Sequence, residues 1–273
     1  MSTPFQSVTI PDTELRTLSS ANVRQEFNIF IALPHTYATG THTYPVLYLL
    51  DANGLFGMAT ETFRVLNFFN EMREIIIVGI GYPGVSTFPA TMGLRTRDYT
   101  PTDNDWYETS YKTSPNAPEY AGEGEAAKFL QFIREELLPF ITTNYRTLPE
   151  DTGIVGYSFG GLFALYTLFH QPDTFKRYFV CSPSVWWGNE FLLGAEKDFA
   201  AKNSDLAAWL FMSVGADEPQ SMLADMYAIA KALVNRKYKS LEMATHILEG
   251  AGHLSVFPPF ICRALKAAYS QTG

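Results

Sequence analysis

The pentapeptide Gly156-Tyr157-Ser158-Phe159-Gly160 follows the G-x-S-x-G pattern, which presents a nucleophilic serine at a sharp strand-to-helix turn. The apolar pair Ile154-Val155 leads into the turn, and a helix-like apolar run over residues 161–169 leads out of it. A serine that only capped a helix would need no glycine on both sides. The pattern therefore predicts Ser158 as the nucleophile of an acyl-transfer site.

A serine hydroxyl needs a base within hydrogen-bonding reach, and three histidines follow Ser158 in the chain. His170 ends the helix that begins at the turn, and His246 lies inside a strand-like run. His253 lies in the glycine-rich loop 250–253 after that run, and loops at the carboxyl ends of strands carry the chemistry of open α/β sheets. We predict His253 as the base; a surface loop histidine is the alternative.

Two adjacent carboxylates, Asp217 and Glu218, follow the strand-like run that ends at Gly215. They precede the histidine, which is the chain order serine, acid, histidine of α/β-hydrolases. The acid commonly stands three residues after a strand-ending glycine, which favours Glu218 over Asp217. It would hold the imidazole tautomer and stabilise the imidazolium. The other reading is a charged helix N-terminus before Pro219.

A tetrahedral oxyanion needs two N–H donors placed in advance. One expected donor is the backbone amide of Phe159, the residue after the nucleophile. The second is expected from the loop at residues 51–54, and we select the amide of Asn53. The alternative is that this loop, with its Asn and Gly, does only the work of a turn.

The elements that must position these residues alternate along the chain. Apolar runs predict strands at residues 23–33, 44–51, 74–82, 151–158, 178–184, 208–215 and 240–248. Helical periodicity marks residues 123–142 and 219–235. The polar segment 84–122 reads as a long loop insertion over one end of the sheet. This alternation predicts an α/β fold with a mostly parallel sheet and helices on both faces.

Length and composition exclude several classes of protein. The 273 residues, 47% hydrophobic and 18% charged, suit one globular domain over residues 1–273. The net charge of −8 argues against a nucleic-acid partner. Cys181 and Cys262 form neither a disulfide framework nor a zinc-site spacing, so we expect no metal. No run suits a signal peptide or membrane span, which makes cytoplasmic residence the default expectation.

Several motifs occur in an order that resembles the putative-esterase branch of the α/β-hydrolases, and within it the trilactone-siderophore (enterobactin-type) esterases. They are YLLDANGLF, RTRDYTPT, GYSFGG, SPSVWW, SVGADE and GAGHLSV. The resemblance spans nearly the whole chain. It implies the α/β-hydrolase fold, with Ser158 as nucleophile, His253 as base and an oxyanion amide near Asn53. Many relatives have glycine where this chain has Ala52, and the acid carries over only loosely.

Substrate contacts are expected from Trp186 and Trp187, which follow a strand-like run, and from Arg97. Arg95 and Asp98 are, like Arg97, candidates to contact an anionic substrate, and the alternative for all three is an ion pair that braces the long segment. For the tryptophans the alternative is that they cap the core. The prediction is a serine carboxylic-ester hydrolase that forms an acyl-enzyme on a small-molecule ester without a cofactor. A trilactone-siderophore esterase, an acyltransferase with the same triad and a non-catalytic binding protein remain the alternatives.

Overall fold

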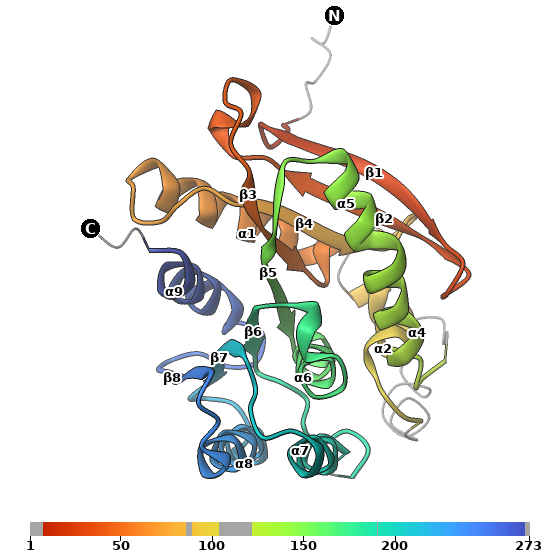
Figure 1. Ribbon diagram of the computed structural model, residues 1–273, viewed down its shortest axis with the longest axis vertical. Coiled ribbons are helices and arrows are strands. Elements are labelled where there is room, and N and C mark those ends of the chain that lie inside the picture. The colour runs from red at the N-terminus through yellow and green to blue at the C-terminus, as the bar shows by residue number, and fades with distance from the viewer. Residues whose placement is uncertain (1–7, 86–88, 104–121, 190, 271–273) are drawn as a thin grey trace, which may run out of the picture.

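A computed structural model describes residues 8–85, 89–103, 122–189 and 191–270. Its centre is an eight-stranded sheet in the order β1-β2-β4-β3-β5-β6-β7-β8 (Figure 1). The strands are β1 (Thr13–Ser20), β2 (Gln25–Ala32), β3 (Tyr44–Leu49), β4 (Ile76–Gly81), β5 (Thr147–Tyr157), β6 (Arg177–Cys181), β7 (Ala208–Gly215) and β8 (Leu241–Leu248). Strands β1 and β2 pair antiparallel and β2 pairs antiparallel with β4, whereas every later pairing is parallel. The expected mostly parallel α/β sheet is confirmed.

Helices cover both faces of this sheet. On one face lie α1 (Ala52–Phe68) and α9 (Phe257–Tyr269), which pack side by side (Figure 1). The other face carries α2 (Met92–Tyr99), α4 (Ala126–Gln131), α5 (Leu138–Asn144), α6 (Phe159–His170), α7 (Phe191–Lys202) and α8 (Gln220–Arg236). The two faces enclose separate apolar cores because β3 to β7 are buried on both sides.

Six of the strands coincide closely with apolar runs of the sequence, and β5 begins earlier than its run. Strand β1 was not predicted from the sequence, because its residues TELRTLSS alternate weakly and several of them face solvent. This edge strand is held by its antiparallel ladder to β2 along its whole length. Pairing with the largely buried strand β2 stabilises β1, although the sequence of β1 has no clear apolar pattern of its own.

The segment 84–122 is not simply a loop, and this corrects the sequence expectation. It contains the short 3₁₀ turn Pro89–Thr91 and the helix α2. That helix carries no apolar stripe, since its buried residues include Arg95, Thr96 and Asp98. Polar contacts of Arg95 and Asp98 hold α2 in place together with the buried ring of Tyr99, so helical periodicity of hydrophobic residues could not reveal the helix. Residues 86–88 and 104–121 of the segment lie outside the described residues.

The predicted helix over 123–142 is continuous but not uniform. It begins as α4, passes through a π-helical stretch (Phe132–Leu137) and ends as α5, with a proline in the first turn of α5. Proline has no N–H, so it cannot join the regular helical ladder at this point.

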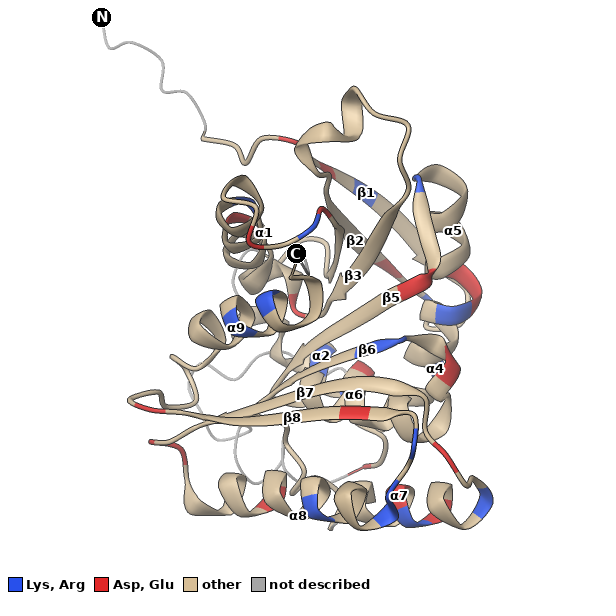
Figure 2. Cartoon of the chain, turned by 60° about the vertical axis from the view of Figure 1, so that its left-hand side comes forward, with Lys and Arg blue, Asp and Glu red and all other residues tan. Residues whose placement is uncertain are grey.

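Acidic and basic residues intermingle on α7 and α8 (Figure 2). No helix among the described residues is long and apolar enough to cross a bilayer.

Candidate active site

Ser158 stands alone between β5 and α6 with φ 58° and ψ −116°, a backbone conformation that L-residues rarely adopt. The helix leaves the strand so abruptly that a Cβ at Gly156 would lie 1.9 Å from the carbonyl oxygen of Gly160. Only glycine fits at position 156. A Cβ at Gly160 would meet its nearest neighbour, Asp51 Oδ2, at 3.3 Å, so the requirement there is weaker. The turn lifts the Ser158 hydroxyl above the carboxyl end of the sheet.

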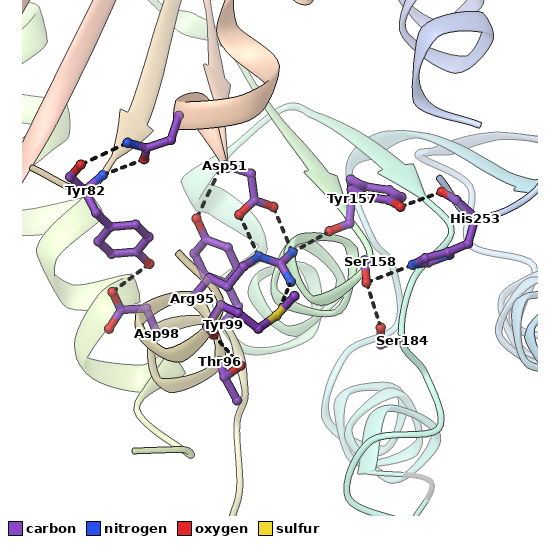
Figure 3. Close-up of polar contacts among 12 residues, drawn as sticks. Asp51, Tyr82, Arg95, Thr96, Asp98, Tyr99, Tyr157, Ser158, Ser184 and His253 are labelled. Carbon is purple, nitrogen blue, oxygen red and sulfur yellow. Dashed lines mark hydrogen bonds and ion pairs between the residues drawn. The ribbon is translucent and has the colours of Figure 1, made fainter. Parts of the chain in front are cut away.

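The structure brings together the three residues selected from the sequence as a triad. The Oγ of Ser158 lies 3.2 Å from Nε2 of His253 (Figure 3). The other ring nitrogen, Nδ1, lies 2.7 Å from Oε2 of Glu218. His253 comes from the loop between β8 and α9, and Glu218 from the loop between β7 and α8. Three loops at the carboxyl ends of parallel strands thus converge on one relay of hydrogen bonds.

Glu218 is buried, with 5% of its surface exposed. Its Oε1 accepts hydrogen bonds from the Ser182 hydroxyl at 2.5 Å and from the Gly215 amide at 2.9 Å. Burial alone would raise the pKa of this carboxyl. The hydrogen bonds from His253, Ser182 and Gly215 outweigh burial and hold the pKa of Glu218 below its ordinary value. Glu218 is therefore kept as a carboxylate, the form that accepts from a histidine N–H.

The other residues weighed for these positions lie elsewhere. Asp217 is exposed, and its backbone amide binds the carbonyl of Ala251. His170 ends α6, where its Nδ1 meets the carbonyl of Tyr166 and its ring stacks on the Tyr166 ring. His246 lies in β8 and stacks on the ring of Phe211.

A cavity of about 290 Å³ opens beside the Ser158 hydroxyl. Its wall is mostly apolar and is formed by Met92, Arg95, Tyr157, Ser158, Phe159, Ser184, Trp186, Met222, His253 and Leu254. The Ser184 hydroxyl lies 3.4 Å from the Ser158 Oγ (Figure 3). Leu254 is 92% exposed and Trp186 is 38% exposed, so both lie at the rim of the cavity.

Two of the three residues expected to touch substrate are placed elsewhere by the structure. Trp186 lines the cavity, but Trp187 is fully buried and its indole N–H donates to the carbonyl of Thr102. Arg97 does not line the cavity. Its guanidinium forms an ion pair with Asp98, which is the bracing ion pair considered as the alternative. It also donates to the side-chain oxygen of Gln25. Arg97 and Trp187 therefore serve the packing of the fold.

Arg95, for which the sequence left open a substrate contact or a bracing ion pair, reaches the cavity wall. It is 1% exposed and makes a two-pronged ion pair with Asp51, through Nε at 2.7 Å and Nη2 at 2.9 Å. Nη2 also donates to the backbone carbonyl of Tyr157 at 3.1 Å (Figure 3). Desolvation works against its charge, but Asp51 prevails and raises the pKa of Arg95. A fixed positive charge thus borders the nucleophile.

Asn53, selected for the oxyanion site, is not among the residues that line the cavity. Its side chain joins α1 to the end of β4: Nδ2 donates to the carbonyls of Tyr82 and Val85, and Oδ1 accepts from the Tyr82 amide. The other donor predicted from the sequence, the amide of Phe159, belongs to a residue that does line it. Arg95 was a candidate contact for an anionic substrate, but the sequence did not predict an oxyanion role for its guanidinium, because no spacing in RTRDYT relates it to Ser158.

No group of three or more His, Cys, Asp or Glu side chains within the described ranges is placed to hold a metal ion. The site described by these distances consists of side chains and backbone groups of this chain. It has the parts that acyl transfer through a serine requires: a hydroxyl, an imidazole, a carboxylate and a neighbouring positive charge.

The family model described as "Putative esterase" matches residues 20–254. The chain belongs to this family. Ferri-bacillibactin esterase BesA of Bacillus subtilis (strain 168) is 34% identical over 275 residues, covering 97% of this chain and 92% of the relative. The resemblance noted in the sequence is confirmed, and the chain is an esterase.

Solved structures support the same fold. The BES protein from Bacillus cereus superposes with a TM-score of 0.84 at 27% identity, covering 98% of this chain and 100% of that one. The siderophore hydrolase EstB from Aspergillus nidulans gives a TM-score of 0.80 at 23% identity, with 98% of each chain covered. The esterase therefore has the α/β-hydrolase fold that was expected.

The lowered pKa of Glu218 predicts how its contribution to stability varies with pH. Because its folded pKa lies below the unfolded value of about 4.3, the carboxylate stabilises the fold above that pH and loses this effect as the pH falls through the folded pKa. We expect Glu218→Gln to lower the free energy of unfolding more at pH 6 than at pH 3, measured by urea denaturation. Asp217→Asn, at an exposed neighbour, is the control. An equal loss at both pH values would contradict the prediction.

Proposed function

We propose that the esterase cleaves its substrate through Ser158, with His253 as general base and Glu218 as the orienting acid. The observation that carries the proposal is the unbroken relay from Ser158 Oγ through the imidazole to Glu218 Oε2. Ser158 Oγ attacks the ester carbonyl while its proton passes to Nε2 of His253. The imidazolium then returns the proton to the leaving alcohol oxygen, which leaves an acyl-enzyme. Water then attacks the acyl carbon as the same imidazole takes its proton; the bond from the acyl carbon to Ser158 Oγ breaks, Oγ receives that proton from Nε2, and the acid leaves.

Glu218 acts in this scheme without receiving the proton. Its carboxylate accepts the Nδ1–H of His253, so the lone pair of Nε2 points toward the Ser158 hydroxyl. When Nε2 is protonated, the same carboxylate stabilises the imidazolium charge. The hydrogen bonds from Ser182 and the Gly215 amide keep this carboxylate charged and in place.

The oxyanion requires donors in place before the negative charge develops. We assign one to the backbone amide of Phe159, the residue after the nucleophile, at the start of α6. We assign the second to the Arg95 guanidinium, because it lines the cavity and is held rigidly by Asp51. In a largely apolar cavity, a fixed cation stabilises a developing anion strongly.

Replacing the triad residues tests the relay. We expect Ser158→Ala to abolish turnover of p-nitrophenyl acetate, and Glu218→Ala to lower kcat by roughly 1,000-fold or more. The matched control is Asp217→Ala, which removes the exposed neighbouring carboxylate and leaves kcat nearly unchanged. Initial rates would be measured on variants whose circular dichroism equals that of the wild type. Activity retained in Ser158→Ala, or a greater loss in Asp217→Ala than in Glu218→Ala, would reject these roles.

Arg95→Lys keeps a positive charge opposite Asp51 but lacks the planar fork that reaches both Asp51 and the site. We expect kcat to fall by about 100-fold while KM changes little, since the lost interaction is made to the transition state. Steady-state kinetics on p-nitrophenyl acetate checks this. Arg97→Lys, whose ion pair lies away from the cavity, is the control. Equal kcat values for Arg95→Lys and wild type would remove Arg95 from the oxyanion site.

For the substrate we propose the ester of a trilactone siderophore. BesA, similar over almost the whole chain, is named as an esterase of ferri-bacillibactin, and this supports the class. A cavity of about 290 Å³ is too small to enclose such a molecule, but it admits one ester arm. The exposed side chains of Trp186 and Leu254 at the rim offer apolar surface to the remainder of the substrate.

A hydrolysis panel separates this substrate from simpler esters. We expect kcat/KM for a trilactone siderophore to exceed that for p-nitrophenyl acetate and for methyl ferulate by more than about tenfold, because contacts remote from the scissile bond also lower the barrier. Products would be followed by liquid chromatography, with Ser158→Ala as the blank. A higher kcat/KM on the small esters would assign the esterase to another substrate class.

A further inference from the structure

Tyr157 occupies the variable position between the first glycine of the pentapeptide and the nucleophile, and it touches the site in three ways. Its phenol O–H donates to the backbone carbonyl of His253 at 2.5 Å (Figure 3). Its ring centroid lies 5.0 Å from that of the His253 imidazole, with the planes inclined by 33°. Its own carbonyl accepts from Arg95. With 6% of its surface exposed, this side chain is almost fully enclosed.

The loop that carries His253 has few other attachments. Leu254, the next residue, is 92% exposed, and Ser255 exchanges hydrogen bonds with Gly252 inside the loop. Ala251 is tied to Asp217 through backbone groups. Among the described residues, the ring of His253 hydrogen-bonds with Glu218 and Ser158, and its backbone carbonyl accepts from Tyr157.

We propose that Tyr157 is a positioning residue for His253: its phenol fixes the His253 backbone and its ring supports one side of the imidazole. Glu218 fixes the same residue separately, at ring atom Nδ1. The base then has two anchors from different strands, Tyr157 at the end of β5 and Glu218 after β7. The inference rests on the proposed role of His253 as base.

The chemistry of the phenol suits this role. Burial raises the pKa of Tyr157, so the phenol remains a proton donor at any pH at which the esterase works. The His253 carbonyl is partly buried and accepts the phenol hydrogen. Phenylalanine at position 157 would preserve the ring contact and remove only the hydrogen bond, which makes Tyr157→Phe a clean test.

We expect Tyr157→Phe to lower kcat on p-nitrophenyl acetate by roughly 10-fold to 100-fold, as small misplacements of catalytic groups do, with KM changed less than about twofold. The downfield proton resonance of the His253 Nδ1–H should broaden as the loop moves. The matched control is Tyr178→Phe, which removes a phenol-to-carbonyl hydrogen bond of the same kind, to Pro172, away from the site. It should change neither kcat nor the resonance. All assays run below the melting transition of each variant.

A double variant separates positioning from general loosening of the fold. If two anchors hold one imidazole, the loss of kcat in Tyr157→Phe combined with Glu218→Gln exceeds the product of the separate losses, since each anchor compensates for the other. An unchanged kcat and a sharp resonance in Tyr157→Phe, while Ser158→Ala is inactive, would overturn this inference alone. Strictly multiplicative losses would also overturn it. Full activity in Ser158→Ala would instead remove the proposed function.

Discussion

The close approach of Gly156 to the carbonyl of Gly160 is the steric constraint on which the site depends. It allows α6 to begin immediately beside β5, so the residue between them takes a positive φ. Such a conformation costs about 1 to 3 kcal/mol and persists only when its surroundings enforce it. Here the Ser158 amide donates to the carbonyl of Cys181, and the Ser158 carbonyl accepts from the amide of Ser184. The end of β6 and the loop that follows it thus hold the nucleophile from both sides.

The buried pair of Arg95 and Asp51 joins the nucleophile turn to a helix that apolar packing alone would not hold. Asp51 itself has a positive φ at the start of α1, and its backbone N–H donates to the Tyr99 hydroxyl oxygen at 3.3 Å. Arg95 extends the connection to the Tyr157 carbonyl. Removing one partner of such a pair leaves an uncompensated buried charge, at a cost of about 3 to 5 kcal/mol. The same contacts that dock α2 therefore set the charge beside the cavity.

The two carboxylates at the site, Glu218 and Asp51, are held by different kinds of hydrogen-bond donor. Glu218 is held as a carboxylate by neutral donors and the imidazole, whereas Asp51 is held by a guanidinium. A second permanent cation beside Glu218 would compete with His253 for its oxygens. Separating the two pairs keeps one carboxylate available to the histidine and the other to the arginine.

Much of this arrangement was readable from the sequence because it follows from local rules. Apolar runs marked the strands, the paired glycines marked the turn, and the chain order of serine, acid and histidine selected Ser158, Glu218 and His253, which the structure brings together. Steric demands of a tight turn and the period of buried strands act over a few residues. Both can therefore be recognised from the types of residue at neighbouring positions.

Only the tertiary structure decided which side chains face the cavity. Trp186 reaches the rim while its neighbour Trp187 is buried, and Arg95 reaches the wall while Arg97 turns to Asp98. Residues one or two positions apart point in different directions, and which direction leads to the cavity depends on how α2 and the loop after β6 pack against distant segments. Residue type and spacing hold no record of that packing, so the sequence determined the parts of the site and the fold determined its walls.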